Sequence, residues 1–230
     1  MYRSMQIASV PASRRPTVAK SRGRPREFDR DAALAAAARL FWSKGYEATS
    51  LSDLKQAMGI GSPSLYAAFL SKEALYVESL QYYRRTYDGL VWGNFAEAAT
   101  AREAVRSFLT DSAAALTGHL ADIPKGCMLV LSSVGSEGHD VLGEIVRSGR
   151  AATVERLEAR FIQAIADGEL SEAVDVHALA RLVQTMQSGM SILARDDVSY
   201  AELRAVAELA IEGWDAYLAK ASRSPEQHDA

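Results

Sequence analysis

The chain has 230 residues, 48% of them apolar, and a formal net charge of −3 at pH 7. This length and composition predict a soluble protein with one small domain and one larger domain. No apolar run approaches the roughly 20 residues of a membrane span, and the N-terminus lacks the apolar stretch of a signal peptide, so we expect a cytoplasmic protein. The single cysteine, Cys127, excludes an internal disulfide and fits a reducing compartment.

Charge is unevenly distributed along the chain. Residues 1–30 hold eight basic residues against two acidic ones, whereas the remainder is net acidic. We expect a disordered basic tail over residues 1–21. In the basic arm over residues 22–28, glycine and proline hold Arg22, Arg24 and Arg26 extended, as the narrow minor groove of DNA requires. A solvated, unbound tail is the alternative interpretation of this segment.

The first helix is predicted to start at Asp29 or Arg30 and to close near Lys44 and Gly45. Its apolar stripe is assigned to the core and consists of Leu34, Ala38, Phe41 and Trp42.

Residues 49–75 have the pattern of two short helices joined at a glycine turn, with a third helix behind them. Ser50 precedes Asp53 by three residues, which predicts reciprocal capping at the start of the first helix. That helix is expected to end at Gly59, because glycine readily adopts the left-handed turn. These features predict a helix-turn-helix, and an ordinary helical hairpin in an all-helical core is the alternative.

The second short helix is predicted to have Ser62 as its cap and Pro63 at its first position. Leu65 and Phe69 are four residues apart and are expected to point inward together. The face left to meet a DNA groove is formed by Ser62, Ser64, Tyr66 and Ala67.

The segment from Phe28 to Leu80 resembles the DNA-binding domain of the tetracycline-repressor (TetR) family of transcriptional regulators. The matching motifs are AARLF at 37–41, GYEATS at 45–50, SLYAAF at 64–69 and SKEAL at 71–75. Their fixed order makes the resemblance far more specific than a lone hairpin. The chain departs from many members of the family at Gly61, Ala67 and Ala68. With these small residues we expect few direct contacts with base edges, and the operator sequence cannot be deduced.

The resemblance implies an all-α protein with a three-helix DNA-binding domain at residues 29–75. It also implies a helical ligand-binding and dimerisation domain at residues 76–221, and we expect residues 222–230 to be a disordered tail. Such a protein is a homodimeric repressor that binds a palindromic double-stranded DNA operator and is released by a small-molecule effector, which stays unidentified here. Activation in place of repression stays open.

Contacts with DNA are predicted from the resemblance and from donor chemistry together. Thr49, Ser50 and Lys72 are expected to meet phosphates. Tyr66 is expected to reach backbone or base, Ser62 and Ser64 to hydrogen-bond base edges, and Pro63 or Ala67 to touch a thymine methyl group.

Beyond this domain the sequence predicts a succession of helices. Ser71 caps a fourth, long helix carrying Leu75, Leu80, Tyr83 and Tyr87. Further helices are expected from Thr100 to about Gly118, from Pro124 to the glycine cluster at 135–138, up to Asp167, after Asp175, and after Ser199.

The last two helices, within residues 175–219, carry long apolar stripes. By resemblance we expect them to form a four-helix dimer interface, with intramolecular core packing as the alternative. The predicted interface residues are Leu179, Leu182, Val183, Met186, Met190, Leu203, Val206, Ala210 and Trp214.

A ligand cavity between the helices is also implied by the resemblance. Large, adaptable apolar side chains suit such a site, although the same residues equally suit core packing. The candidates are Trp92, Phe95, Phe108, His119, Met128, Phe161 and Met186. Cys127 has two interpretations, buried packing and oxidant sensing, of which packing is the default.

The sequence contains no paired metal-binding cysteines, no zinc-protease helix motif, no phosphate loop and no exposed-nucleophile motif. We therefore expect no catalytic residue, no metal site and no cofactor. A helical enzyme, or a DNA-binding accessory protein without ligand response, are the alternative classes.

Overall fold

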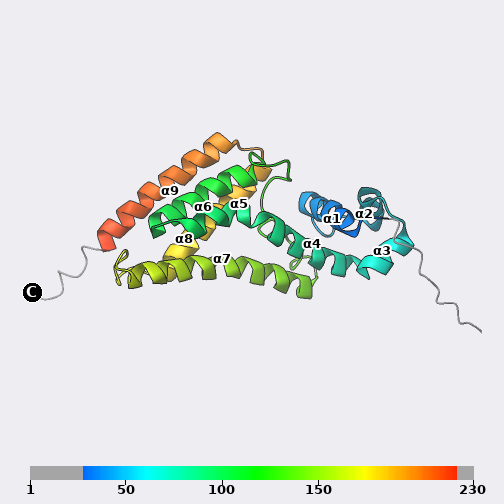
Figure 1. Ribbon diagram of the computed structural model, residues 1–230, viewed down its shortest axis with the longest axis horizontal. Helices are drawn as coiled ribbons and strands as arrows, with labels where there is room; N and C mark the ends of the chain where they lie inside the picture. Colours follow the sequence, from blue (N-terminus) through cyan, green and yellow to red (C-terminus); the bar gives the residue numbers. More distant parts are fainter. Residues whose placement is uncertain (1–27, 222–230) are drawn as a thin grey trace, which may run out of the picture.

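The computed structural model describes residues 28–221, and the regular structure in that range is entirely helical (Figure 1). The predicted all-α class is confirmed. In chain order the helices are α1 (Arg30–Lys44), α2 (Leu51–Met58), α3 (Ser62–Phe69), α4 (Lys72–Tyr87), α5 (Gly89–Glu97), α6 (Ala101–Leu116), α7 (Asp140–Ala166), α8 (Val176–Arg195) and α9 (Tyr200–Ala221).

Helices α1 to α4 surround a shared core that is built around aromatic rings. Phe41 of α1 lies edge-on to Tyr76 of α4, with 5.1 Å between ring centroids. Tyr46, just after α1, lies 5.1 Å from the same Tyr76 ring. All three side chains are buried, and α1 packs against both α2 and α4. This core is the platform that holds α2 and α3.

Helix α4 carries the chain from the N-terminal core into the C-terminal bundle (Figure 1). Leu75 and Leu80 are buried in the N-terminal core, whereas Tyr83 contacts both cores. The expected domain boundary between residues 75 and 76 therefore falls inside α4, and it stays a prediction. Four buried residues from beyond α4 also complete the N-terminal core, namely Met128, Val134, Leu142 and Val146.

In the C-terminal bundle, α6 packs against α5, α8 and α9. It begins with a capping box in which Thr100 and Glu103 each satisfy the other's backbone amide. The predicted starts of the last two helices are confirmed as well. Asp175 accepts a hydrogen bond from the amide of Ala178 at 2.9 Å, and Ser199 shares reciprocal bonds with Glu202.

The prediction of a helix starting at Pro124 was wrong, because residues 117–139 form turns. Gly126 has a φ of +79°, and a Cβ placed there would lie 2.9 Å from the backbone oxygen of Ser191. The next amide, that of Cys127, donates to the hydroxyl of Ser191 at 2.7 Å. Backbone groups that a helix would need are therefore committed to tertiary contacts.

Helix α5 was not predicted as a separate element. It follows α4 directly, and Asp88 is both the C-cap residue of α4 and the N-cap residue of α5. In the part of the chain that the structure describes, no helix is both long enough and apolar enough to cross a bilayer.

Candidate functional site

The turn between α2 and α3 is built as the sequence predicts. The hydroxyl of Ser50 accepts a hydrogen bond from the amide of Asp53 at 3.0 Å, and the carboxylate of Asp53 accepts one from the amide of Ser50 at 3.1 Å. The Ser50 amide, helped by Lys44 at 3.3 Å, lowers the pKa of Asp53 below its ordinary value. Gly59 ends α2 in the left-handed conformation with a φ of +65°. These contacts fix the start and the end of α2.

Helix α3 turns one face inward and one face outward. Leu65 and Phe69 are each 1% exposed, which confirms the predicted inward pair. On the other side Pro63, Tyr66 and Ala67 are exposed, and Tyr66 keeps 46% of its surface in solvent. The outward face of α3 is thus free to contact a partner.

The predicted capping role of Ser62 was wrong. The N-cap of α3 is Gly61, no side chain caps this helix start, and Ser62 lies within the first turn together with Pro63. Ser62 and Ser64 are half-buried at the edge of the outward face. Because neither hydroxyl has a hydrogen-bond partner among the described residues, both keep their donors for an outside group.

Thr49 is the one candidate DNA contact that the structure removes. The residue is fully buried, and its hydroxyl donates to the carbonyl of Gly45 at 2.6 Å. Its side chain joins the end of α1 to the start of α2 and cannot also reach a phosphate. The neighbouring Ser50 is exposed and remains a candidate.

Lys72 lies at the first position of α4, where free backbone amides and the helix dipole favour an anion. Its ammonium group lies 4.2 Å from the ring centroid of Tyr46, which orients the side chain. The Tyr46 hydroxyl in turn donates to the carboxylate of Glu73 at 3.0 Å. Lys72 is therefore held against Tyr46 at the start of α4, three residues after the end of α3.

The three arginines of the predicted basic arm precede α1. Arg22, Arg24 and Arg26 lie outside the described residues, so their predicted role in DNA binding stays a prediction.

Arg30 is a structural residue that the sequence analysis did not single out. It donates to both carboxylate oxygens of Glu78 at 2.9 and 2.7 Å and lies 4.4 Å from the ring centroid of Phe69. It joins α1 to α3 and α4.

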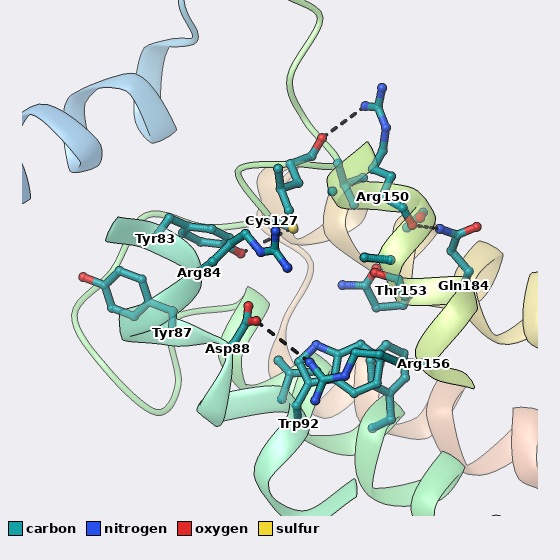
Figure 2. Close-up of a pocket in the computed structure, with 18 residues that line it drawn as sticks. Tyr83, Arg84, Tyr87, Asp88, Trp92, Cys127, Arg150, Thr153, Arg156 and Gln184 are labelled. Carbon is teal, nitrogen blue, oxygen red and sulfur yellow. Dashed lines mark hydrogen bonds and ion pairs between the residues drawn. The ribbon is translucent and has the colours of Figure 1, made fainter. Parts of the chain in front are cut away.

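A cavity of about 70 Å³ lies between α4, α5, α6, α7 and α8 (Figure 2). Its wall combines aromatic rings with several charged and polar side chains. The residues that line it are Tyr83, Arg84, Tyr87, Asp88, Val91, Trp92, Phe108, Cys127, Leu129, Val130, Gly149, Arg150, Ala152, Thr153, Arg156, Gln184, Gln187 and Ser188.

Two of the seven predicted ligand residues, Trp92 and Phe108, line this cavity. The other five lie elsewhere, because selection by size and apolarity does not distinguish a cavity wall from core packing. Phe95 and Phe161 are buried in the C-terminal core, and Met128 is buried in the N-terminal core. His119 stacks on Tyr200 at an exposed site, and Met186 lines a separate groove.

Cys127 also lines the cavity and is 9% exposed. The hydroxyl of Tyr83 donates to its sulfur at 3.3 Å. Burial, together with the neighbouring thiol, raises the pKa of Tyr83 well above its ordinary value, so this hydroxyl stays protonated as a donor. The buried environment agrees with the packing interpretation of Cys127.

Trp42 of α1 connects the wall of the cavity to the N-terminal core. The Trp42 ring lies 4.8 Å from that of Tyr83 and 5.4 Å from that of Tyr87, and both tyrosines line the cavity. Its indole nitrogen donates to the carbonyl of Gly126 at 2.9 Å. At the end of α8, Arg195 donates to the carbonyls of Trp42 and Ser43, the last turn of α1.

The predicted dimer residues divide into two groups. Five are buried within the subunit, where they pack in its own core: Leu179, Val183, Met190, Leu203 and Trp214. The other four keep part of their surface in solvent: Leu182, Met186, Val206 and Ala210. The two groups differ because α6 and α7 already cover one side of α8, and α6 covers one side of α9.

Apolar and glycine residues that are exposed or half-buried form a stripe along α8 and α9. On α8 it contains Leu182, Met186, Gly189 and Leu193, and on α9 it contains Val206, Leu209, Ala210, Gly213 and Tyr217. Between the two helices lies a groove of about 190 Å³, with Trp214 at its base. The buried indole nitrogen of Trp214 has no hydrogen-bond partner among residues 28–221.

A helix-turn-helix with an exposed second helix, joined by α4 to a helical bundle with a cavity, defines the class of helix-turn-helix DNA-binding proteins. Residues 33–78 match the profile of the bacterial regulatory proteins of the tetR family. The HTH-type transcriptional repressor ComR of Escherichia coli (strain K12) is 37% identical over 202 residues, which cover 86% of this chain and 94% of that protein. This chain belongs to the TetR family of transcriptional regulators.

Similar solved structures agree with this assignment. One is the TetR family transcriptional regulator CifR, a cysteine mutant complexed with 26-bp double-strand operator DNA. It is 37% identical, covers 83% of this chain and 98% of its own, and has a TM-score of 0.78. A TetR transcriptional regulator from Rhodococcus sp. RHA1 is 39% identical, covers 78% of this chain and 96% of its own, and has a TM-score of 0.53.

Proposed function

We propose that this protein is a dimeric repressor that binds a palindromic operator through α3 and leaves it when a small molecule fills the cavity between α4 and α8. The observation that carries the proposal is the outward face of α3, which is exposed while Leu65 and Phe69 anchor the opposite face. The names of two similar proteins support it, since ComR is a repressor and CifR is complexed with operator DNA. Such a protein acts in the cytoplasm, where its operator lies.

Each exposed side chain around α3 has a role that follows from its chemistry. Tyr66, in the middle of the outward face, reaches a base or a phosphate with its hydroxyl. Pro63 and Ala67 are small and apolar and suit the methyl group of thymine, whereas Ser62 and Ser64 offer donors to base edges. Ser50 and Lys72 bind phosphates on either side.

The apolar stripe on α8 and α9 is the proposed dimer interface. Leu182 and Leu209 are 51% and 64% exposed in the subunit. Apolar surface in water is unfavourable, and packing against a second copy of the chain would remove it from water. Gly189 and Gly213 let the two helix pairs approach closely, since a Cβ at either position would meet nothing within 4 Å in the subunit. A twofold axis through this face places two α3 helices on one operator.

Release from DNA needs a ligand that prefers one of two conformations, because equal affinity for both shifts nothing. The contacts of Trp42 supply the route in this proposal. A ligand that displaces Tyr83 or Tyr87 changes the surface on which Trp42 packs, and therefore the position of α1 and of the helix-turn-helix. Arg195 connects the same end of α1 to the proposed dimer helix α8.

The decisive experiment is selection of binding sites from random double-stranded DNA with the full-length protein at fixed salt. We expect a palindrome whose half-site centres are about 34–36 Å apart, one helical turn of DNA. Enrichment of a single, non-repeated site would contradict the dimer. Failure to enrich any sequence, with the protein folded and bound to all DNA equally, would contradict specific readout by α3.

A further inference from the structure

The cavity wall carries more positive than negative charge. Arg84 on α4, and Arg150 and Arg156 on α7, line it together with one acidic residue, Asp88 (Figure 2). Arg150 is already engaged, because it donates to the carbonyls of Leu129 and Ser132 at 3.1 and 3.4 Å. Arg84 and Arg156, by contrast, have no hydrogen-bond acceptor among the described residues.

Arg156 is placed by stacking and not by a close ion pair. Its guanidinium carbon lies 3.9 Å from the ring centroid of Trp92, and its nearest nitrogen lies 3.9 Å from the carboxylate of Asp88. The second distance is too long for a hydrogen bond. Burial lowers the pKa of Arg156 from its ordinary value, which indicates that the charge is incompletely compensated. Among the described residues, no group accepts a hydrogen bond from this guanidinium.

Asp88 does not neutralise the two arginines that flank it. Figure 2 shows its side chain between those of Arg84 and Arg156. Burial raises the pKa of Asp88 above its ordinary value, and the two arginines only partly oppose that shift. One carboxylate facing two guanidinium groups leaves a net positive charge. A cationic ligand would be repelled there, whereas an anionic ligand would complete the pairing.

The rest of the wall suits a small amphipathic molecule. Trp92, Phe108 and Val91 form an apolar surface, with 4.5 Å between the two ring centroids. The hydroxyl of Thr153 and the amide of Gln187 line the same cavity and have no hydrogen-bond partner within residues 28–221. A volume of about 70 Å³ is well below that of the cavities that hold drug-sized ligands.

We propose that the effector is a small organic anion, a monocarboxylate with a short aliphatic or single-ring apolar part. Its carboxylate binds the guanidinium groups of Arg84 and Arg156, and its apolar part lies on Trp92 and Phe108. Arginine is suited to this role because its planar donors pair with both oxygens of a carboxylate. The inference rests on the proposed regulatory function only in taking this cavity as the effector site.

The test measures binding of two carboxylates and their neutral isosteres to the full-length protein by calorimetry. The probes are butyrate and benzoate, compared with butyramide and benzamide. We expect at least one carboxylate to bind about 10-fold or more tightly than its amide, because the charged pair is desolvated in the cavity.

The same ratio is then measured in substituted proteins. Arg156→Gln and Arg84→Gln should each reduce the preference for the carboxylate, and Arg156→Lys should keep part of it because the charge is retained. Arg85→Gln is the matched control. Arg85 neighbours Arg84 on α4 but lies outside the cavity, with its guanidinium 5.3 Å from the ring of Tyr82. The ratio, unlike the affinity alone, is insensitive to a general loss of packing.

Operator binding of the same samples separates this inference from the function on which it rests. Amides that bind as tightly as carboxylates, a preference that survives in the Arg84→Gln, Arg156→Gln double variant, or no carboxylate binding up to about 10 mM would each overturn the effector class. If the unliganded protein nevertheless binds its selected operator, the repressor proposal stands. If it binds no operator while carboxylates bind as expected, the repressor proposal fails and the anion site stands.

Discussion

The outward face of α3 and the outward face of α8 and α9 differ in composition and in length. The first is two turns of helix and offers one tyrosine among serine, proline and alanine side chains. The second runs along two helices of 20 and 22 residues and offers mainly leucine, methionine, valine, alanine and glycine. Both faces are exposed in the subunit, yet only the second has a large apolar surface.

This difference indicates which kind of partner each face is suited to bind. Apolar area gains free energy when another apolar surface replaces water, so the α8 and α9 stripe suits a second copy of the chain. The face of α3 has little apolar area to bury, and its hydroxyls suit the polar edges of bases and phosphates. The predictions below test this division, from the largest expected effect to the smallest.

Leu182→Arg should give the largest effect. By twofold symmetry the substitution places two charges in one apolar interface and removes two buried leucines, each worth about 1.5–3 kcal/mol. The dimer dissociation constant should rise about 100-fold or more, with operator affinity falling in parallel. Sedimentation velocity over a range of concentrations measures the first and fluorescence anisotropy the second.

Ile162→Arg is the matched control for that substitution. Ile162 lies on α7, outside the stripe, and is 59% exposed, compared with 51% for Leu182. It should leave assembly unchanged. Equal disruption by both variants would show that the α8 and α9 stripe has no special role.

Tyr66→Ala should lower operator affinity about 10-fold to 100-fold, the range expected when a specific contact is lost at both half-sites. Thermal stability should change much less than operator affinity, because Tyr66 is 46% exposed and is not part of the buried core. Tyr66→Phe separates the hydroxyl from the ring: affinity like that of the wild type would mean that only the ring is used. Unchanged affinity in Tyr66→Ala would exclude this residue from the reading surface.

Lys72→Ala should act mainly on the salt dependence. If each Lys72 neutralises one phosphate, the slope of log affinity against log salt should lose about one unit for each half-site. Discrimination between operator and random DNA should stay nearly constant. Lys125→Ala serves as the control, because Lys125 is ion-paired with Asp197 in the C-terminal half. An unaltered slope in Lys72→Ala would remove the phosphate contact.

Asp53→Asn should have the smallest effect, on stability alone. Folding lowers the pKa of Asp53, so its contribution is present above the ordinary carboxyl pKa and is lost as pH falls through the lowered value. In urea denaturation the variant should be less stable than wild type at pH 7, and the difference should shrink below about pH 4. A difference that grows on acidification would contradict this account.

The sequence predicted best those features that depend on neighbouring residues. The Ser50 and Asp53 caps, the Gly59 turn and the inward pair Leu65 and Phe69 are set within one or two helical turns, so a local pattern is sufficient. Family resemblance added the overall architecture. Two wrong predictions were local as well: Gly61 and not Ser62 is the N-cap of α3, and the hydroxyl of Thr49 donates to the carbonyl of Gly45, four residues earlier. The predicted helix at Pro124 failed because of distant contacts, since Trp42 and Ser191 bind the backbone of Gly126 and Cys127.

The cavity and the apolar stripe show the same limit. Apolar residues of α8 and α9 extend beyond the sides that α6 covers, so spacing could not tell which leucines would be buried. The charged residues of the cavity were missed because Arg84 and Asp88 look like ordinary surface residues of a long helix. Only the approach of α7, which brings Arg156 beside them, makes them part of one site.

The positions of the three tryptophans also have a practical consequence. Trp92 borders the cavity, Trp42 packs against two tyrosines of its wall, and Trp214 lies at the base of the groove between α8 and α9. The ultraviolet emission of the unlabelled protein should therefore respond both to an occupied cavity and to subunit association. Replacing each indole in turn with phenylalanine would assign the two signals without any attached dye.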